Sequence, residues 1–511
     1  MRVSSNLYVT EKEIRSLGGS VSQLQDDLTL PNPEYQNFMR FGKGRFYKKI
    51  DPHICYLRKA GMEYVVPRYY FGEPEKGEQI LGRKTSWGFK FKLRDYQTEF
   101  FEEYAEEVIN NSGILMEAPC GHGKTIMAIY LSFLRKRQSL VLVPTYYLAN
   151  QWKSRIEEST DATVKVVTVK DKEIPTDSDF TVIVMDLFSV RTLPEELYRN
   201  VGHVILDEAH RVGAEVYLPI LDEIPAYYRT ALTATFRRSD GVHRVLAYHF
   251  GKHLKMENRF PKPLVYGVDT GVEVRAVISK NRPYEDTVSF FDRNGVKYHE
   301  TGNAVAFWPP ANIVLALEKE LKDGTVKKTA YREIKSALKR GMELQYSVVE
   351  SYLGGHSGRT KRMEKLIRMS LDKGRTVLFL SKRKDVLRMF HKKFSEYRPV
   401  LIVAETNSRT EEEEKYLQTE CRLILGISQL AKEGMDIDRL DTLILFLPIK
   451  DTEQAIGRIS RLHPDKKPPV VLYPVDSCPF TYSVFNGAKK FMKINAEFKG
   501  VRNLLTVKTV L

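Results

Sequence analysis

A glycine-rich segment near residue 120 has the residue types that bind nucleotide phosphates. Residues 118–125 read Ala-Pro-Cys-Gly-His-Gly-Lys-Thr and lie between an apolar run and an amphipathic stretch. Gly121 and Gly123 would let backbone N–H groups approach the phosphates, and the following helix would add partial positive charge. Lys124 is expected to contact the β- and γ-phosphates, and the Thr125 hydroxyl to hold Mg²⁺. An accidental glycine-rich turn is disfavoured because a predicted strand precedes the segment and a predicted helix follows it.

Two adjacent carboxylates follow a second apolar run. Residues 204–206 are Val-Ile-Leu, and Asp207 and Glu208 come directly after them. Beside a bound nucleotide, Asp207 would be a Mg²⁺ ligand together with Thr125, and Glu208 would be the base that polarises the attacking water. The alternative is an acidic strand end without function, which the upstream phosphate-binding segment disfavours.

Two arginines near residue 460 could complete a phosphate site. Arg458 and Arg461 lie in residues 454–461, Gln-Ala-Ile-Gly-Arg-Ile-Ser-Arg. An arginine brought to the γ-phosphate stabilises the charge that develops there during hydrolysis. Taken alone, arginines three residues apart on a helix more often form a surface face of salt bridges, so their interpretation depends on the other motifs.

The elements that must position these residues form two series. From residue 93, short apolar runs alternate with amphipathic stretches, a pattern typical of parallel strands separated by helices. Runs that are apolar throughout indicate strands buried on both faces. The predicted strands are 114–117, 140–143, 181–185, 203–206 and 230–232 in the first series, and 376–380, 400–403, 422–425, 442–447 and 470–473 in the second. The sequence therefore predicts an α/β protein with two doubly wound parallel-sheet lobes.

The two series also suggest domain boundaries. Residues 71–85, rich in glycine and charge, are typical of a linker. The expected parts are a small N-terminal domain at 1–90, a nucleotide-binding first lobe at 91–260, a second lobe at 261–480 with an insertion at 285–345, and a C-terminal tail at 481–511.

The insertion fits neither series. Asp-Arg-Asn-Gly at 292–295, between apolar residues, predicts a β-hairpin over 287–300. The side chains of Phe290, Phe291, Arg293 and Tyr298 on this hairpin would form a strand-separating wedge, or the segment would be a plain structural hairpin, which is the favoured interpretation. Residues 322–340 predict a basic helix. The wider segment 321–368 holds 12 Lys or Arg against 5 Asp or Glu, which fits a basic arm on a duplex or a plain surface helix equally well.

Composition favours a polyanionic partner. The 511 residues include 80 Lys or Arg against 65 Asp or Glu, a net charge of +15, although a basic balance also fits a solvated surface. In residues 40–49, bases alternate with aromatics, so Arg45, Lys48 and Lys49 are expected to contact DNA, with a solvated hairpin as the alternative. The four cysteines are far apart, and the chain shows no signal peptide or membrane span. We therefore expect a soluble protein of the cytoplasm.

These motifs, in this order over residues 93–475, resemble those of the superfamily 2 helicases. The resemblance implies two RecA-like lobes, with ATP and Mg²⁺ as cofactors and nucleic acid as the partner. The matching segments are Leu93–Gln97 for the adenine-reading motif, Val141–Thr145 with Gln151-Trp152 for motif Ia, Asp207–His210 for motif II, Thr233–Thr235 for motif III, Val377–Ser381 for motif IV, Gly426–Gln429 with Glu433–Asp436 for motif V, and Gln454–Arg461 for motif VI.

The resemblance also implies roles for single residues. It has ATP bound between the lobes, with Gln97 contacting the base. The remaining implied residues are Gly434 and Asp436 at the nucleotide, His210, Thr233, Thr235 and Gln454 in coupling, and Thr145 and Ser381 on the nucleic-acid backbone. Two positions depart from the usual pattern: Ala118 replaces the first glycine of the general phosphate loop, and Asp186 stands where a threonine is common in motif Ic.

Residues 235–241, Thr-Phe-Arg-Arg-Ser-Asp-Gly, resemble the XPB-like and phage branch-migrating group. That likeness implies an ATP-dependent DNA helicase or translocase that acts on forks and Holliday junctions, working as a monomer without a membrane, in the host cytoplasm if the protein is viral. The alternatives are an RNA helicase, the motor of a restriction system, and a nucleic-acid clamp that does not hydrolyse ATP.

Overall fold

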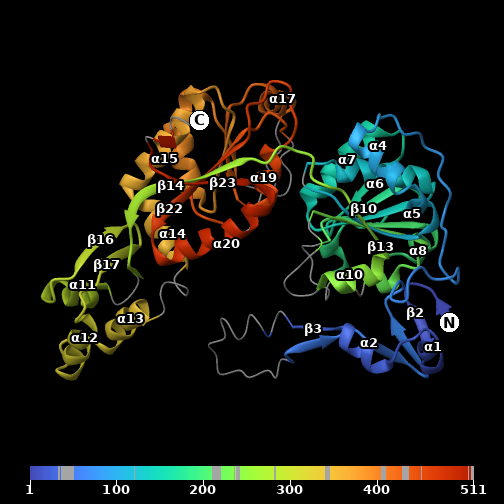
Figure 1. The fold of residues 1–511 in the computed structure, drawn as a ribbon, viewed down its shortest axis with the longest axis horizontal. Coiled ribbons are helices and arrows are strands. Elements are labelled where there is room, and N and C mark those ends of the chain that lie inside the picture. Colours follow the sequence, from blue (N-terminus) through green and yellow to red (C-terminus); the bar gives the residue numbers. More distant parts are fainter. Residues whose placement is uncertain are drawn as a thin grey trace. The chain divides into compact units, whose positions relative to one another are not determined.

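The structure, a computed structural model, divides into two compact units, Met1–Arg259 and Phe260–Leu511 (Figure 1). Within the described residues, no helix is long and apolar enough to cross a membrane. The described residues are 1–32, 35, 51–119, 121–209, 220–234, 236, 242–280, 284–339, 346–403, 410–428, 437–449, 452–504 and 506–507.

The first unit contains a seven-stranded sheet in the order β13-β7-β12-β11-β8-β10-β9, with every neighbouring pair parallel. Successive residues of a strand face opposite sides of a sheet. On β8, Leu140 and Leu142 accordingly pack into one apolar cluster, and Val141 and Val143 into another. The strands are β7 (Gly113–Glu117), β8 (Ser139–Val143), β9 (Val164–Val167), β10 (Phe180–Val184), β11 (His203–Leu206), β12 (Tyr228–Thr233) and β13 (Lys252–Lys255).

Helices cover this sheet on both faces, as the buried strands require. Helix α7 begins where the Thr145 hydroxyl accepts a hydrogen bond from the Leu148 N–H at 3.4 Å. The helices among the described residues are α4 (Asp95–Glu103), α5 (Ala105–Asn110), α6 (Lys124–Arg135), α7 (Tyr146–Ser159), the 3-10 turn η1 (Met185–Ser189), α8 (Glu195–Asn200) and α10 (Val242–Phe250).

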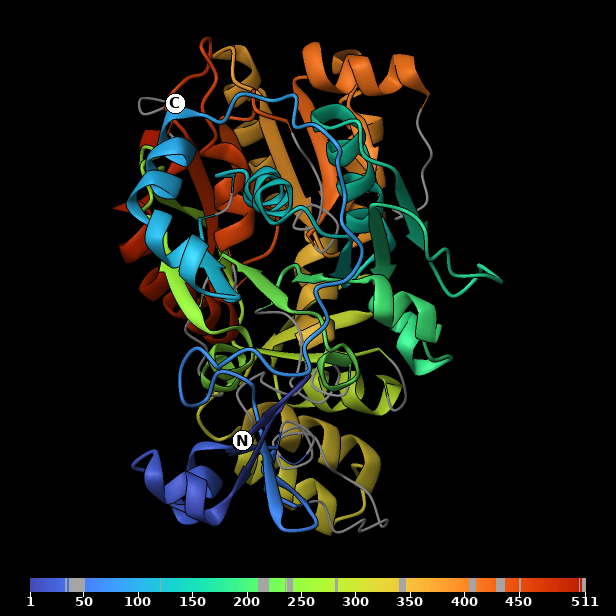
Figure 2. The ribbon, with the colours of Figure 1, turned by 90° about the vertical axis from the view of Figure 1, so that its right-hand side faces the viewer.

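The described part of the N-terminal domain is a small antiparallel sheet with the helices α1 and α2. Its strands run in the order β1-β2-β6-β5. Strands β3 and β4, which fall between β2 and β5 in the sequence, form a separate two-stranded sheet. Both views show this dark-blue domain outside the main sheet of the unit (Figure 1, Figure 2). Its elements are β1 (Arg2–Val3), β2 (Leu7–Thr10), α1 (Glu11–Ser16), α2 (Val21–Asp27), β3 (Thr29–Pro31), β4 (His53–Cys55), β5 (Arg58–Ala60) and β6 (Glu63–Val66).

Asp222 fastens the N-terminal domain to the first lobe. Its carboxylate accepts a hydrogen bond from Asn6 Nδ2 at 2.6 Å and forms an ion pair with Arg58 at 2.6 Å. Nearby, the fully buried guanidinium of Arg68 donates to the Ala226 carbonyl at 2.7 Å. The domain is therefore attached to the segment that leads from motif II into β12.

The predicted linker at 71–85 is pinned to the lobe instead of hanging between domains. Ile80 N–H donates to the Pro225 carbonyl at 2.8 Å, and Arg83 N–H donates to the Asn200 carbonyl at 2.8 Å. Gly82, with φ of 63°, lies so close to the Asn200 carbonyl that a Cβ there would approach it to 2.3 Å. The glycines of this segment allow close packing, a use of glycine that composition does not distinguish from flexibility.

The second unit contains another seven-stranded sheet of parallel pairs, in the order β19-β20-β18-β21-β22-β14-β23. Its strands are β14 (Leu264–Glu273), β18 (Val377–Ser381), β19 (Val400–Ile402), β20 (Leu423–Ile427), β21 (Thr442–Leu445), β22 (Val470–Ser477) and β23 (Glu497–Arg502). Its described helices are α15 (Ser357–Asp372), α16 (Lys384–Lys393), the 3-10 turn η2 (Ser395–Tyr397), α17 (Glu411–Thr419), α19 (Glu453–Ile459) and α20 (Pro479–Asn495).

The predicted C-terminal tail is wrong, because α20 and β23 belong to this lobe. Strand β23 pairs with β14 at the edge of the sheet, and Phe485, Ala488 and Met492 of α20 are buried in its apolar core. The lobe therefore extends to Arg502, beyond the boundary predicted at residue 480.

The insertion is a module with a core of its own. Its antiparallel sheet, in the order β15-β17-β16, packs on one face against α11 to α13 and on the other against α14. Figure 1 shows the module at the far end of β14 from the strand's start. Its elements are β15 (Ala276–Ser279), α11 (Tyr284–Arg293), β16 (Lys297–Thr301), β17 (Ala304–Trp308), α12 (Ile313–Lys322), α13 (Lys328–Lys339) and α14 (Tyr346–Gly355).

The hairpin predicted at 287–300 is also wrong. Thr287, Phe290 and Phe291 lie on α11 and are buried, and the Asp-Arg-Asn-Gly sequence ends that helix, with Gly295 at φ of 60°. Apolar positions at i, i+3 and i+4 are the helical pattern, which the turn sequence obscured. Because Phe290 and Phe291 are fully buried, they are not a strand-separating wedge. The predicted basic helix at 322–340 is α13, which starts six residues later than expected.

Candidate nucleotide site

The glycine-rich loop wraps in front of helix α6. Gly121 and Gly123 have φ of 86° and 75°, a left-handed conformation that favours glycine. Lys124 opens α6, and its ammonium group donates to the Ala118 carbonyl at 3.0 Å. The loop and the first turn of α6 therefore present N–H groups and a cation in one place, which suits a phosphate chain. Cys120 lies outside the described residues.

Gln97 holds helix α4 against this loop. The side chain is 3% exposed, and its Nε2 donates to the His122 carbonyl at 2.9 Å. Its Oε1 accepts from the Arg94 N–H at 3.0 Å. A Cβ at Gly123 would lie 2.5 Å from Gln97 Nε2, so the glycine is needed for this approach. The structure thus brings the predicted base-reading residue to the phosphate loop itself.

Asp207 and Glu208 follow β11, which is separated by a single strand, β12, from β7, the strand that leads into the loop. Asp207 is 5% exposed; its Oδ2 accepts from Trp152 Nε1 at 2.7 Å and its Oδ1 from the Glu208 N–H at 2.8 Å. Burial, and then the charge of Glu208, raise the pKa of Asp207 to about 6, while the hydrogen bond from Trp152 and then the charge of Lys124 act in the opposite direction. Glu208 has φ of 50°, a left-handed conformation that costs a residue with a side chain roughly 1–2 kcal/mol.

This set of groups fits a nucleotide with Mg²⁺. Mg²⁺ takes oxygen ligands and is usually held by one or two carboxylates together with substrate phosphates and water. Thr125 at the start of α6 and the Asp207 carboxylate supply such oxygens. The described part of the chain contains no group of three or more His, Cys, Asp or Glu that would form an all-protein metal cage. A Mg²⁺ ion held by Thr125 and Asp207 would take further ligands from the phosphates and water.

Motif III lies on the strand between these two edges. β12 pairs with β7 on one side and β11 on the other. The carbonyl of Thr233, which is 2% exposed, accepts from the Ala118 N–H at 3.0 Å. Beyond it, Phe236 N–H donates to Glu117 Oε1 at 3.3 Å, and His253 contacts the other oxygen at 2.8 Å. These contacts join the motif III segment to the strand that carries the phosphate loop.

Electrostatics at Glu117 favour the ionised form. Burial acts to raise the pKa of Glu117, but hydrogen bonds from His253 and from the Phe236 N–H outweigh it and leave the pKa below its ordinary value. Glu117 is therefore a carboxylate that accepts hydrogen bonds from both partners.

In the second unit, the predicted residues have different surroundings. Arg458 lies on α19, but Arg461 comes after the helix ends at Ile459, so the two do not share one helical face as their spacing suggested. Arg461 is paired with Asp438 at 3.4 Å, with its side chain 11% exposed. Ser381 is 1% exposed and its Oγ accepts from the Arg383 N–H at 3.1 Å, so its hydroxyl is not presented to a nucleic-acid backbone.

Several predicted residues cannot be placed. They lie outside the described residues, or on a helix at a position whose side chain is not described: Arg45, Lys48, Lys49, His210, Thr235, Gly434, Asp436 and Gln454. Their roles stay predictions.

Trp152 is a residue whose role the sequence did not reveal. The resemblance placed Trp152 in motif Ia without a role of its own, and the structure shows that its indole is fully buried and bonded to Asp207. Leu148, Trp152 and Ile156 are all buried and four residues apart, and this spacing places them on the inner face of α7. That periodicity is the signal that could have indicated a buried tryptophan.

Comparisons with known proteins match both lobes. The family model "Type III restriction enzyme, res subunit" matches residues 90–238, and "Helicase conserved C-terminal domain" matches residues 358–463. A protein of Acanthamoeba polyphaga mimivirus, provisionally named an ATP-dependent RNA helicase, is 23% identical over 467 residues, 89% of this chain and 78% of the relative. The DNA 3'-5' translocase XPB2 of Sulfurisphaera tokodaii is 34% identical over 156 residues, 30% of this chain and 34% of the relative.

Among solved structures, the crystal structure of T4 UvsW aligns over 95% of this chain and 97% of the UvsW chain, at 13% sequence identity and a TM-score of 0.35. The glycine-rich loop, the Asp-Glu pair and the helicase family models together identify an ATP-dependent enzyme. The chain carries both domains of a superfamily 2 helicase, and over 156 residues it is similar to an XPB-type translocase.

Proposed function

We propose that this helicase is a DNA translocase that acts on branched DNA such as forks and four-way junctions. The observation that carries the choice of DNA is the 34% identity, over 156 residues, with a relative named as a DNA translocase. The net charge of +15 supports a polyanionic partner. The N-terminal domain and the inserted module add surfaces beyond the two sheets, which a branched substrate could contact. We further propose that a single chain carries out the reaction.

The first unit would bind and activate ATP. Lys124 holds the terminal phosphates, and Thr125 and Asp207 supply oxygens for Mg²⁺, which when bound neutralises charge on the phosphates. Glu208, next to Asp207, accepts a proton from the attacking water. Gln97 contacts the adenine base. Because the Gln97 side chain is also bonded to the His122 carbonyl of the phosphate loop, binding of the base would affect the conformation of that loop.

Arginines of the second unit would complete hydrolysis. Arg458 and Arg461 are the candidates, since a guanidinium stabilises negative charge on the γ-phosphate during transfer. Their participation would make hydrolysis depend on lobe closure, which converts the chemical cycle into movement along the nucleic acid.

The test is the ATPase rate with single-stranded DNA, linear duplex, a four-way junction and structured RNA, all at one salt concentration because phosphate contacts are salt-sensitive. The Glu208→Gln variant supplies the background rate. We expect the junction to stimulate most. Strongest stimulation by RNA would contradict the proposal and favour the RNA activity that several viral relatives carry in their names.

A further inference from the structure

Helix α7 has exposed side chains at its N-terminus and a buried tryptophan near its middle. At its N-terminus, directly after the Thr145 cap, Tyr146 is 50% exposed and Tyr147 is 37% exposed. Six residues beyond Tyr146, Trp152 is fully buried. Exposed tyrosines beside a helix N-terminus suit a nucleic-acid backbone, because hydroxyls, N–H groups and the helix dipole all favour phosphate oxygens.

The buried end reaches the acidic pair of the nucleotide site. Trp152 Nε1 donates to Asp207 Oδ2 at 2.7 Å. Leu148 and Ile156, one turn before and after on the same face, lie in the same apolar cluster as the indole. An indole packed on both sides cannot swing independently, so displacement of α7 must displace the N–H group that the carboxylate accepts.

Two donors set the orientation of the Asp207 carboxylate. One is the Glu208 N–H at 2.8 Å, which belongs to the same strand end. The other, Trp152 Nε1, comes from a different element. Because a carboxylate has about four lone-pair sites, these two bonds leave others for a cation while fixing the plane of the group. Trp152 is thus the only described donor to this carboxylate from outside its own strand segment.

We propose that Trp152 is a positioning residue, which orients the Asp207 carboxylate toward Mg²⁺ and transmits nucleic-acid contact at the start of α7 to that ligand. The transmission step rests on the proposed function, since it requires α7 to meet the nucleic acid. The orientation step requires only nucleotide binding.

A matched control lies in the same core. Trp87 packs against the apolar cluster that contains Trp152, with its ring centroid 5.2 Å from that of Phe180. Its Nε1 is buried and makes no hydrogen bond within the described residues. Trp87→Phe therefore removes an unbonded N–H from this core, whereas Trp152→Phe removes a bonded one at nearly the same loss of volume.

The first experiment measures the Mg²⁺ concentration that half-saturates binding of fluorescent mant-ADP, without hydrolysis. We expect Trp152→Phe to raise this midpoint about tenfold, the usual effect of removing a hydrogen-bond partner of a metal ligand. Trp87→Phe should leave it within about twofold of the wild type. Equal midpoints in the two variants would overturn the orienting role.

A second measurement keeps Trp152 in place, in case its replacement prevents folding. The chain has three tryptophans. The double variant Trp87→Phe/Trp308→Phe leaves Trp152 as the sole emitter. Its emission should change when Mg²⁺ is added to the ADP complex, with the same midpoint as mant-ADP binding. Trp152 fluorescence that does not change when Mg²⁺ is added would contradict the proposal.

Transmission is tested by adding duplex DNA to the same titrations. DNA should lower the Mg²⁺ midpoint of the wild type and of Trp87→Phe, but not that of Trp152→Phe. An equal DNA shift in all three proteins would overturn transmission. The proposed function is tested by a separate measurement. It fails if DNA does not stimulate the ATPase rate.

Discussion

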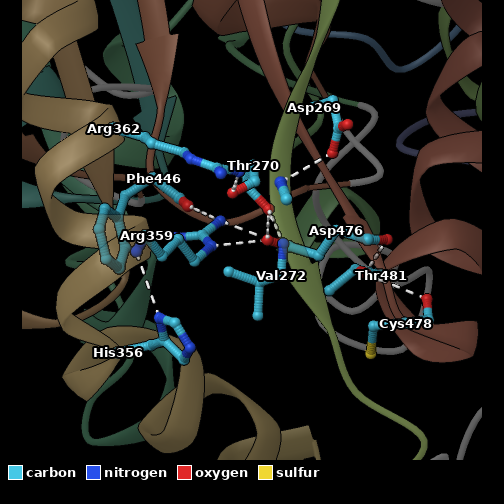
Figure 3. Close-up of polar contacts among 11 residues, drawn as sticks. Asp269, Thr270, Val272, His356, Arg359, Arg362, Phe446, Asp476, Cys478 and Thr481 are labelled. Carbon is cyan, nitrogen blue, oxygen red and sulfur yellow. Dashed lines mark hydrogen bonds and ion pairs between the residues drawn. The ribbon is translucent and has the colours of Figure 1, made fainter. Parts of the chain in front are cut away.

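Arg359 and Asp476 form an ion pair with both side chains fully buried. Arg359 Nε donates to Asp476 Oδ1 at 2.7 Å and Nη2 to Oδ2 at 3.3 Å (Figure 3). The same Nη2 also donates to the Phe446 carbonyl at 2.5 Å, and the Thr270 hydroxyl donates to Asp476 Oδ1 at 2.5 Å. The pair therefore ties α15, β22, β14 and the segment after β21 together at one point.

Breaking this pair should strongly destabilise the second unit. Asp476→Ala leaves a buried guanidinium without its carboxylate, which costs about 3–5 kcal/mol of unfolding free energy. Urea unfolding checks this. Asp385→Ala is the control, because the Arg383–Asp385 pair is exposed and should be worth less than about 1 kcal/mol. Equal losses in the two variants would mean that the buried pair contributes no more than a surface pair.

Glu208→Gln should abolish hydrolysis while nucleotide binding persists. Loss of a general base lowers kcat by roughly a hundredfold to ten-thousandfold. Binding of mant-ADP should change by less than about threefold, since the ligand-holding groups remain. Glu195→Gln, on the surface of α8, is the control and should leave both quantities unchanged. Turnover in Glu208→Gln at the wild-type rate would refute the assignment of the base.

Lys466 should make the free energy of unfolding increase with pH in the alkaline range. Burial lowers the pKa of Lys466 to about 8. Its unfolded pKa is near 10.4. Between these values the unfolded chain binds the extra proton, so stability rises with pH from about 8 to about 10. The gain should be at most about 1 kcal/mol per pH unit, because the side chain is partly exposed. Lys466→Met should show a smaller rise in urea unfolding over that range; an unchanged slope would contradict this origin.

Asp222→Ala should loosen the N-terminal domain from the first lobe. It removes the acceptor for Asn6 and the ion-pair partner of Arg58. Hydrogen exchange in β2 and β6 should become faster, and DNA stimulation of the ATPase should fall more than the rate without DNA. Glu78→Ala, which breaks an exposed contact with Arg2, is the control. If both variants exchange alike, Asp222 is not the fastening point.

The nucleotide site was the part of the molecule most open to sequence reasoning. The strand, the glycine turns and the helix that carry Lys124 are consecutive in the chain, so local rules decide their arrangement. The Trp152–Asp207 bond joins residues 55 positions apart and depends on which face of α7 is buried. Local patterns also misled at 287–300, where turn residues outweighed the helical spacing of Phe290 and Phe291. The strand β23 was missed because its membership of the sheet is a long-range pairing with β14.

The position of β14 has a consequence for synthesis on the ribosome. The first unit can fold as it emerges, since its strands pair within residues 113–255. Strand β14 emerges next, yet its two partners, β22 and β23, are translated about two hundred residues later. Throughout that interval, a ten-residue strand with an apolar first half has neither edge paired, a state prone to aggregation. We therefore expect the nascent chain to be open to edge-to-edge association through β14 from the time this strand is made until residues 470–502 have left the tunnel.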